Sequence, residues 1–382
     1  MKKSTVLLVI LVFGLLTLWL ETAWMWAIEQ VALFLLAGWC VLTLGPVRNL
    51  RGSERMLPLA GIVLLCVVQL VAHTTVDRWE TTAGLYTWLA WLMACLAGFT
   101  ALSDDGEREA FLLNAEIAGV AIAVLAILHR TTSHGKVFWI FETGRKMVMG
   151  VFPYENQYAA FILLLLPGAF MRAFRNTPHR WSSVAGAGLM VASVVSSSSV
   201  AGAILVLGET LLVVATVSFQ LHWKLSRHIA LATGILVLAT VLGSVSGWGD
   251  MLTDLERRNA LESRRLLTLS TIQMARERPL TGWGMGTWTE VYPAYARFDD
   301  GAFDNAAHND WAQWASDGGV GMLLLMAAFT AMIVRPAFRS VWGIGLLFVL
   351  AYSLIEFHFQ ERPQFGCFFF ALAGLLLAYG KS

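Results

Sequence analysis

The sequence has little charge and few cysteines or prolines for its length. Asp, Glu, Lys and Arg make up 14% of the 382 residues, whereas 57% of the residues are hydrophobic. Soluble domains carry about a quarter of charged residues, so this composition excludes an ordinary soluble protein. The formal net charge of +1 provides no general basic character for binding nucleic acid, and we expect no nucleic-acid partner.

The few cysteines and histidines also exclude several kinds of site. Cys40, Cys66, Cys95 and Cys367 fall within apolar segments, and none of them forms a CxxC motif. Cysteines in such surroundings usually behave as small buried side chains. The eight histidines show neither HxH nor HExxH spacing. We therefore expect neither a metal centre nor a cofactor.

Long apolar segments are abundant. A helix needs about 20 apolar residues to cross a bilayer. The pattern predicts an all-α, polytopic integral membrane protein with about twelve transmembrane helices, organised as a single membrane domain over residues 1–382. The predicted spans are 5–20, 23–44, 56–72, 84–102, 110–128, 157–172, 181–198, 200–218, 228–247, 317–334, 341–357 and 364–380.

The distribution of Lys and Arg predicts the orientation of the chain, because cytoplasmic loops are rich in these residues. Fourteen of them lie on the side of the termini, whereas only Arg78 and Arg362 lie in the short connections on the other side. We therefore expect both termini in the cytoplasm. Two long loops, 129–156 and 247–316, and the serine cluster 196–199 then share the outer face.

The loop 247–316 is far longer than a turn between membrane helices requires, and connections longer than about 15 residues are usually functional or disordered. A helix is predicted over 252–278 and would end at Pro279. Arginines seven residues apart would share one face of this helix. The two such pairs are Arg257 with Arg264, and Arg258 with Arg265. Guanidinium groups suit a lipid-linked pyrophosphate; a solvated helix face or contacts to lipid headgroups are the alternative.

A polar cluster of His308, Asn309 and Asp310 closes this loop just before an apolar segment. Histidine is well suited to act as a general base near neutral pH, and its position predicts a place near the membrane interface. The alternative is a structural histidine at a helix start, with Asn309 or Asp310 as the N-cap.

Two other segments have ligand-binding features. In PLTGWGMGTW, residues 279–288, alternating glycines allow close approach of the backbone. The segment lacks the strand and the Lys-Ser/Thr of a nucleotide loop, and a plain turn is the alternative. In the first long loop, Arg145 and Lys146 precede Asn156, which opens a predicted span and can cap the helix or bind a sugar hydroxyl. Interfacial anchoring is the alternative there.

Four carboxylates lie in or near predicted spans: Glu29, Glu116, Glu209 and Glu356. Carboxylates within a membrane suggest ion or proton pathways by default. These four are scattered along the chain, so we keep transport as a minor alternative.

Between about Arg145 and Arg362, these segments together resemble the O-antigen ligase and polymerase superfamily of bacterial envelope glycosyltransferases. GVFPYENQYAAF is similar to the family's Gly-x-Phe-x-Asn-x-Asn segment, with Tyr154 in place of the first Asn and Asn156 as the second. Arg264 matches the family's arginine ahead of Pro-Leu-x-Gly-x-Gly.

The stretch AHNDWAQWASDGGVG resembles the family's His-Asn-x-x-Leu-Gln-x-x-x-Glu-x-Gly-x-x-Gly segment. Ala312 stands where Leu is common, and Asp317 replaces Glu. A further departure is Val200, which occupies the place of an arginine that the family usually has after a serine. We expect Arg145 to take the role of that missing arginine.

The resemblance implies transfer of a glycan from undecaprenyl pyrophosphate to an acceptor hydroxyl, on lipid A–core or a similar glycolipid or glycan, without metal or nucleotide sugar. It implies a multi-pass protein of the bacterial inner membrane with a periplasmic active site. Arg264 and His308 would be catalytic: the arginine holds the pyrophosphate, and the histidine orients or deprotonates the acceptor hydroxyl.

The resemblance also suggests residues that bind substrate. Further cations for the pyrophosphate would be Arg265 and Arg145. Polar residues that hold sugars or position the histidine would be Asn156, Asn309 and Asp310. Aromatic residues that stack on sugar rings or anchor the loop in headgroups would be Trp283, Trp288 and Tyr292.

Three alternatives stay open. A polymerase of the same superfamily would use another lipid-linked glycan as acceptor. A protein O-glycosylating relative would use a pilin-like acceptor. A glycolipid flippase or transporter, from a different class of protein, would need a continuous polar path through the bundle.

Overall fold

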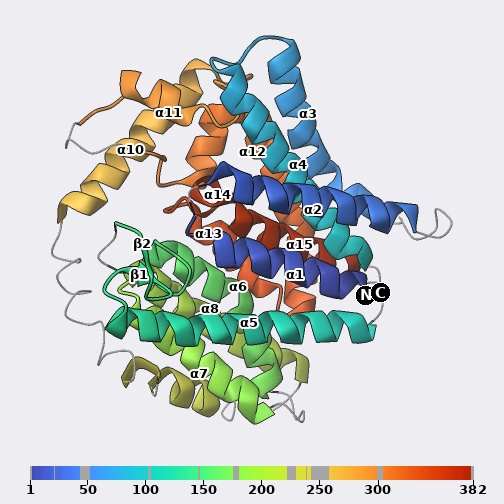
Figure 1. Ribbon diagram of the computed structural model, residues 1–382, viewed down its shortest axis with the longest axis vertical. Helices are drawn as coiled ribbons and strands as arrows, with labels where there is room; N and C mark the ends of the chain where they lie inside the picture. The colour runs from blue at the N-terminus through green and yellow to red at the C-terminus, as the bar shows by residue number, and fades with distance from the viewer. Residues whose placement is uncertain are drawn as a thin grey trace.

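The protein is a bundle of helices (Figure 1), seen here in a computed structural model. The all-α prediction is confirmed: in the described residues, a hairpin of two short antiparallel strands, β1 (Lys136–Val137) and β2 (Phe141–Glu142), is the only named sheet. The described residues are 2–20, 22–43, 52–101, 105–144, 147–174, 180–221, 229–237, 239–241, 258–298 and 304–379.

The first half of the chain forms long apolar helices. They are α1 (Lys3–Thr17), α2 (Ala23–Leu42), α3 (Leu57–Val71), α4 (Arg78–Ala101) and α5 (Asp105–Thr132), with the 3-10 helix η2 (Ser53–Met56) before α3. In α5, acidic residues occupy the first turn, and His129 and Arg130 occupy the last. This arrangement complements the helix dipole.

The second half contributes the centre of the bundle and a polar segment beside it. Its helices are α6 (Glu155–Phe174), α7 (Arg180–Ser196), α8 (Val200–Leu221), a short apolar helix Ile229–Val241, α10 (Arg258–Glu277), α11 (Trp288–Val291), η3 (Tyr292–Ala294), α12 (Asp310–Ser340), α13 (Ile344–Tyr352), α14 (His358–Glu361) and α15 (Pro363–Tyr379). Helix α6 is almost entirely buried, and so is α15 beside it.

Small residues let the helices pack closely. Gly98 of α4 lies against the backbone of Ala371 in α15, and Gly374 of α15 lies against the backbone of Cys95. Such contacts are common between membrane helices, because they bring two backbones into van der Waals contact. All four cysteines are buried and unpaired, as expected.

The predicted number of twelve spans is not confirmed. Among the described residues, seven helices are long and apolar enough to cross a membrane: Ala23–Leu42, Ser53–Val71, Arg78–Ala101, Asp105–Thr132, Glu155–Phe174, Val200–Gln220 and Asp310–Ser340. The other predicted spans coincide with shorter apolar helices. In the predicted span 341–357, α13 has only 9 residues, about 14 Å at 1.5 Å per residue, and the chain then leaves the helix before Glu356.

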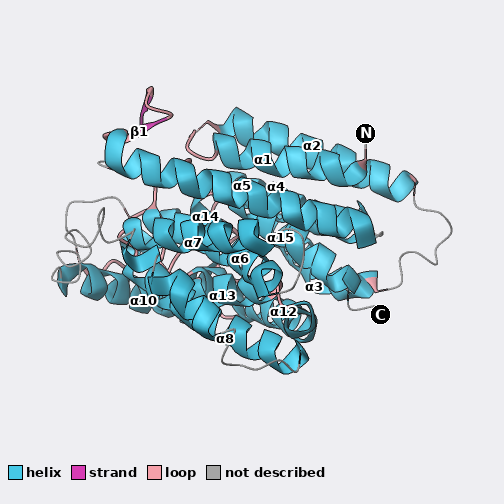
Figure 2. Cartoon of the chain, turned by 90° about the horizontal axis from the view of Figure 1, so that it is seen from below, coloured by secondary structure: helices cyan, strands magenta, loops and turns pink. Residues whose placement is uncertain are grey.

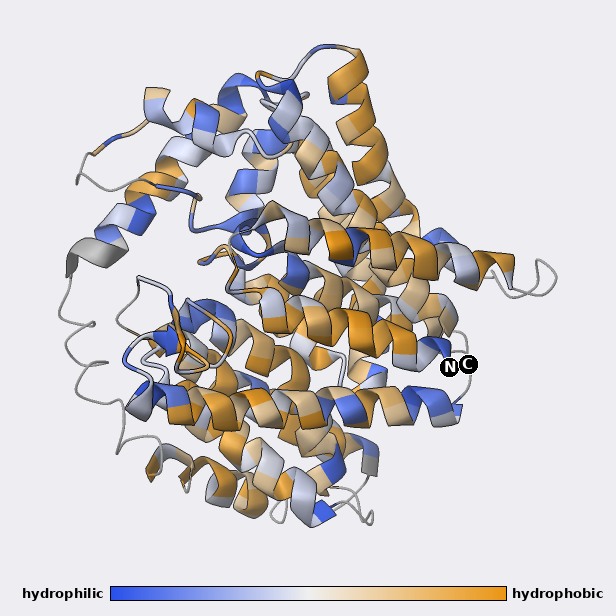
Figure 3. Ribbon diagram, in the orientation of Figure 1, coloured by the Kyte–Doolittle hydropathy of each residue, from blue (hydrophilic) through white to orange (hydrophobic). Residues whose placement is uncertain are grey.

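A polar segment, residues 258–309, forms a cap at one end of the bundle; its residues 299–303 are not described. Figure 3 shows α10 and α11 as largely hydrophilic or mixed, against apolar helices such as α3. The cap has its own apolar cluster of Leu267, Met274, Trp288, Val291, Tyr292 and Ala307. In Figures 1 and 2, both ends of the chain lie at the opposite end of the molecule from α10.

The glycine-rich segment attaches the cap to α12. Trp283 N donates to Ser316 O at 2.9 Å, and Val320 N donates to Pro279 O at 2.7 Å. Gly319 interrupts α12 with φ 66° and ψ −163°, and a side chain there would meet the backbone of Pro279. Gly282, with φ 64°, lies against the backbone of Asp317 in the same way. Close backbone contact with α12 therefore explains Gly282, whereas Gly284 and Gly286 also have positive φ but face the start of α4 and the segment before it.

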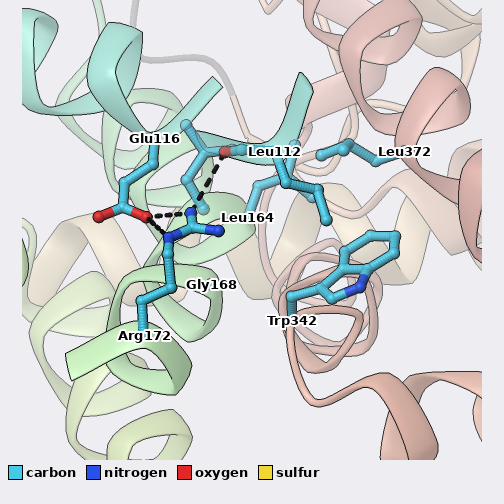
Figure 4. A pocket seen from close by; sticks show the side chains of 8 residues that line it. Leu112, Glu116, Leu164, Gly168, Arg172, Trp342 and Leu372 are labelled. Carbon is cyan, nitrogen blue, oxygen red and sulfur yellow. Dashed lines mark hydrogen bonds and ion pairs between the residues drawn. The ribbon is translucent and has the colours of Figure 1, made fainter. Parts of the chain in front are cut away.

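A buried ion pair joins α5 to α6 far from the cap. Arg172 Nε donates to Glu116 Oε2 at 2.6 Å, and Arg172 Nη2 donates to Leu112 O at 3.3 Å. Figure 4 shows the guanidinium enclosed between these partners, with Trp342 and Leu372 on the other side of the small pocket. We call this pair the α5–α6 lock.

Candidate active site

The segment between α13 and α14 places a buried carboxylate beneath the cap. Glu356 has a side chain that is only 3% exposed, although it follows the last residue of α13 by four positions. A buried carboxylate requires charged or hydrogen-bonding partners. Three other elements supply them: α10, the segment before α12, and α6.

Arg264 comes from α10 and forms an ion pair with this carboxylate. Its Nη1 lies 2.7 Å from Glu356 Oε1, and its side chain is 36% exposed. A guanidinium carries five N–H donors in a planar fork. Arg264 therefore has donors left for a second anion while one of its nitrogens contacts Glu356.

His308 approaches the same carboxylate from the other oxygen. His308 Nδ1 lies 3.6 Å from Glu356 Oε2, and the side chain is 25% exposed. Its backbone has φ 50°, a conformation that non-glycine residues seldom adopt and that is concentrated at functional sites. The imidazole also packs edge-on against Phe357, with ring centroids 4.3 Å apart. These contacts fix the ring beside Arg264.

Asn156, at the start of α6, connects this group to the bundle through hydrogen bonds. Asn156 Nδ2 donates to Glu356 Oε1 at 2.6 Å, and Ser199 Oγ donates to Asn156 Oδ1 at 2.6 Å. Ser199 Oγ also lies 3.0 Å from the Tyr352 hydroxyl, and it accepts from Gly202 N at 3.1 Å. Asn156 therefore orients Glu356, and Ser199 orients Asn156.

Asn309 and Asp310 have structural positions at the start of α12. Asn309 is the N-cap, and its Oδ1 accepts from Ala312 N at 2.9 Å. Asp310 is fully buried; its backbone N donates to Ser353 O at 2.9 Å, and its Oδ2 accepts from Phe359 N at 3.4 Å. Asp310 thus holds both sides of the loop that carries Glu356.

Two further predicted site residues, Arg265 and Trp283, lie apart from this group. Arg265 is exposed and pairs with Glu262 at 3.0 Å. Trp283 packs inside the cap, with the Arg278 guanidinium 4.0 Å from its ring centroid. The predicted Arg145 lies outside the described residues.

Two aromatic residues that were predicted to face a sugar or the headgroups are buried instead. The rings of Trp288 and Tyr292 stack on each other with centroids 4.4 Å apart and a 12° interplanar angle. They are 1% and 5% exposed. The cap buries them because a short segment needs its own apolar core to hold its shape.

At neutral pH, Glu356 is charged, whereas the nearby His358 is neutral. Burial raises the pKa of Glu356, but the neighbouring His308 and the Arg264 charge lower it further, and the pKa ends below its usual value. Burial lowers the pKa of His358, which follows two residues later, to about 4. At neutral pH, the group therefore contains one fixed cation, one fixed anion and the partly exposed imidazole of His308.

Glu356 is the candidate site residue that the sequence interpretation missed, together with the supporting Ser199 and Tyr352. Glu356 was grouped with scattered membrane carboxylates, although its predicted span ended on the outer face, where the arginine and histidine were expected. That coincidence was the available signal. In the described residues, no group of three or more His, Cys, Asp and Glu side chains is placed to hold a metal ion.

Val200, which stands where the related family has an arginine, begins α8 immediately after Ser199. Its side chain is partly buried. The edge of the site formed by Ser199 therefore carries an apolar group instead of a second guanidinium. In the described part of this site, Arg264 is the cation in contact with Glu356.

The fold and the site define the class of protein: an integral membrane protein with an arginine, a histidine and a carboxylate gathered between a polar cap and a helix bundle. Residues 185–327 match the family model described as O-antigen ligase. This match confirms the resemblance to the O-antigen ligase and polymerase superfamily, and it supports enzymatic activity of that general type. The matched segment contains Ser199, Arg264 and His308. No curated protein matches the chain.

Proposed function

We propose that the protein transfers a glycan from undecaprenyl pyrophosphate to an acceptor hydroxyl at the periplasmic face of a bacterial inner membrane. The observation that carries this proposal is the meeting of Arg264 and His308 on the two oxygens of Glu356. A fixed cation beside an imidazole suits a reaction in which an anionic leaving group departs and a hydroxyl loses its proton.

An apolar groove beside the site supports a lipid-linked donor. It has a volume of about 520 Å³ and lies between α10 and α12, where its lining includes Ile272, Trp311 and Val320. Asn309 and Leu354, which also line it, are close in sequence to His308 and Glu356. A polyprenyl chain in this groove would bring its pyrophosphate toward Arg264.

The residues divide the reaction into two roles. The acceptor oxygen bonds to the anomeric carbon while the bond between that carbon and the phosphate oxygen breaks. The pyrophosphate leaves with the electron pair, and Arg264 stabilises its charge. The acceptor proton passes to His308, and the adjacent Glu356 anion stabilises the imidazolium and orients the ring. Asn156 positions Glu356 in this scheme.

The test is glycan transfer in a deletion strain complemented with Arg264→Ala or His308→Ala. Each variant should lower transfer by about 10²-fold or more, since each removes a main electrostatic or proton-transfer contribution. Arg264→Lys should also fail, because an ammonium group does not reproduce the planar fork. Arg265→Ala is the matched control and should retain activity, because this residue is next in sequence to Arg264 and, in the described chain, pairs with Glu262 alone.

Normal membrane abundance with full transfer in both alanine variants would refute the assigned roles. The same deletion strain separates ligase from polymerase. Accumulation of long, unligated lipid-linked chains indicates a ligase, whereas accumulation of single repeat units indicates a polymerase.

A further inference from the structure

A second cavity, different in character from the apolar groove, lies on the other side of the segment that carries His308. It has a volume of about 250 Å³ and is formed by α4, the glycine-rich segment, the start of α12 and the α14–α15 junction. Asn305 and Gln313, which both line it, stand three residues before and five residues after His308. Phe359, another lining residue, donates its backbone N–H to Asp310. The cavity is therefore next to the candidate active site.

Helix α4 turns one continuous face toward this cavity. The lining residues of α4 follow the spacing of a single helical face: Glu80, Ala83, Gly84, Thr87, Trp88 and Trp91. The two indoles are almost fully buried, with 3% and 2% exposure. They form a rigid apolar floor, and the polar groups stand around it.

Unused hydrogen-bonding groups surround the cavity. Within the described chain, the side chains of Glu80, Thr87, Thr289, Asn305 and Gln360 have no hydrogen-bond partner, although all five line the cavity. Gln313 uses its carbonyl oxygen to accept from Ala307 N at 3.0 Å and keeps its amide N–H groups. The cavity thus offers hydroxyl, amide and carboxylate groups together.

Thr87 differs from two other threonines of α4 in that its hydroxyl has no partner in the described chain. Thr82 donates to Arg78 O at 2.7 Å, and Thr100 donates to Leu96 O at 2.6 Å. A threonine within a helix commonly donates its hydroxyl to the backbone carbonyl four residues earlier. Thr87 faces the cavity, and its hydroxyl makes no such bond.

We propose that this cavity binds one uncharged sugar ring of the glycan substrates. A ring bearing several hydroxyls matches the mixture of donors and acceptors over an apolar floor. Among the described residues, the lining contains a carboxylate, Glu80, and no Lys or Arg, so it disfavours phosphate groups and uronic acids. Arg264 would hold the charged part of the donor, and this cavity would hold a neutral ring. This inference rests on the proposed function, because it assigns a second subsite to the same reaction.

The experiment measures binding of methyl glycosides to the purified full-length protein in detergent by saturation-transfer difference NMR. The panel contains methyl glucoside, galactoside, mannoside and N-acetylglucosaminide, with methyl glucuronide as the anionic comparison. At least one neutral glycoside should bind saturably, and the glucuronide should bind more weakly. Thr87→Phe fills the cavity and should weaken binding at least tenfold. Thr82→Phe, on the same helix but outside the cavity, should leave binding unchanged.

Thr87→Val keeps the test valid if the phenylalanine variant does not accumulate. It removes only the hydroxyl and should weaken binding about three- to tenfold, the value of one hydrogen bond. If no neutral glycoside binds, or if binding is equal in wild type, Thr87→Phe and Thr87→Val, the subsite is disproved.

Competition experiments identify which glycan supplies the ring. A bound glycoside that competes with the lipid-linked donor assigns the ring to the donor glycan, and one that competes with the acceptor assigns it to the acceptor. If the bound glycoside competes with neither the donor nor the acceptor, the cavity has no role in the reaction and the proposal is overturned. Arg264→Ala should keep glycoside binding and lose transfer. If that variant instead retains transfer while Thr87→Phe abolishes binding, the proposed roles at Arg264 fail and the sugar site stands.

Discussion

Two arginine–glutamate pairs stand near the two ends of α6, and they differ in what else they contact. In the α5–α6 lock, Arg172 is 14% exposed and Glu116 is 6% exposed. The guanidinium of Arg172 also bonds the backbone of α5. At the cap end, Arg264 is 36% exposed, and Glu356 is shared with His308 and Asn156.

The first pair is buried and joins two helices, whereas the second pair has a cation that a ligand can reach. The lock leaves Arg172 little freedom, so its contribution is to stability. The cap-side pair holds its carboxylate rigidly but leaves the cation accessible from outside. A second anion can approach Arg264 without breaking the packing around Glu356.

The largest effect should come from breaking the lock. Arg172→Leu leaves Glu116 buried without its partner, and the loss of such a pair destabilises by about 3–5 kcal/mol. Thermal unfolding of the purified protein in detergent measures this change. The double variant Arg172→Leu/Glu116→Leu should recover most of the stability, since no lone charge is left buried. Equal stability of Arg172→Leu and wild type would show that the pair is not a structural lock.

Neutralising the cap-side carboxylate should affect the reaction more than the fold. Glu356→Gln removes the anion that faces His308 and should lower transfer about 10²-fold, within the range for positioned proton transfer. Its membrane abundance should be near normal. Glu116→Gln is the matched variant in the lock and should lower stability without lowering transfer per folded molecule. The comparison fails if the two variants show the same pattern.

Acid should destabilise the protein through His358, which lies on the cap side of the molecule. Histidine titrates near pH 6.5 in an unfolded chain, whereas burial lowers the pKa of folded His358 to about 4. Between these values, the unfolded chain binds more protons, so stability falls as the pH is lowered from about 6.5 toward 4. Melting temperatures across this range measure the slope. His358→Phe, which preserves an aromatic ring beside Tyr352, should reduce it; an unchanged slope would exclude His358 as its source.

The smallest effect should come from the hydrogen bond that supports Asn156. Ser199→Ala removes one donor that is connected to His308 through Asn156 and Glu356, and it should lower transfer roughly fivefold, equivalent to about 1 kcal/mol. Ser196→Ala is the control, because in the described chain that hydroxyl bonds only to the preceding turn of α7, to Ser193 O at 2.9 Å. A loss as large as that of Glu356→Gln would instead place Ser199 in contact with substrate.

The sequence predicted the helical membrane fold and the region of the site more fully than the internal contacts. Arg264 and His308 were expected at one surface, because each belongs to a motif with its own local signal. Glu356 carries no such signal: it follows an apolar run, and only tertiary folding brings it beneath α10. Hydropathy alone likewise extended the predicted span 341–357 past the actual end of α13 at Tyr352.

The aromatic residues of the cap illustrate a second limit. Trp288 and Tyr292, which lie in a polar loop, were predicted to stack on sugar rings or to anchor the loop in headgroups. Sequence position does not distinguish an exposed ring from one that packs inside a small domain. The cap buries the rings of Trp288 and Tyr292. The polar side chains around the second cavity that lack a partner in the described chain come from residues that were assigned to no motif.

The bend at Gly319 has a mechanical consequence. The backbone bond from Val320 to Pro279 joins the lipid-facing part of α12 directly to the end of the helix that carries Arg264. Membrane helices tilt to match the thickness of the surrounding bilayer, and a tilt of α12 would carry α10 with it. Vesicles made from lipids of different acyl-chain length should therefore change how closely the guanidinium approaches the imidazole.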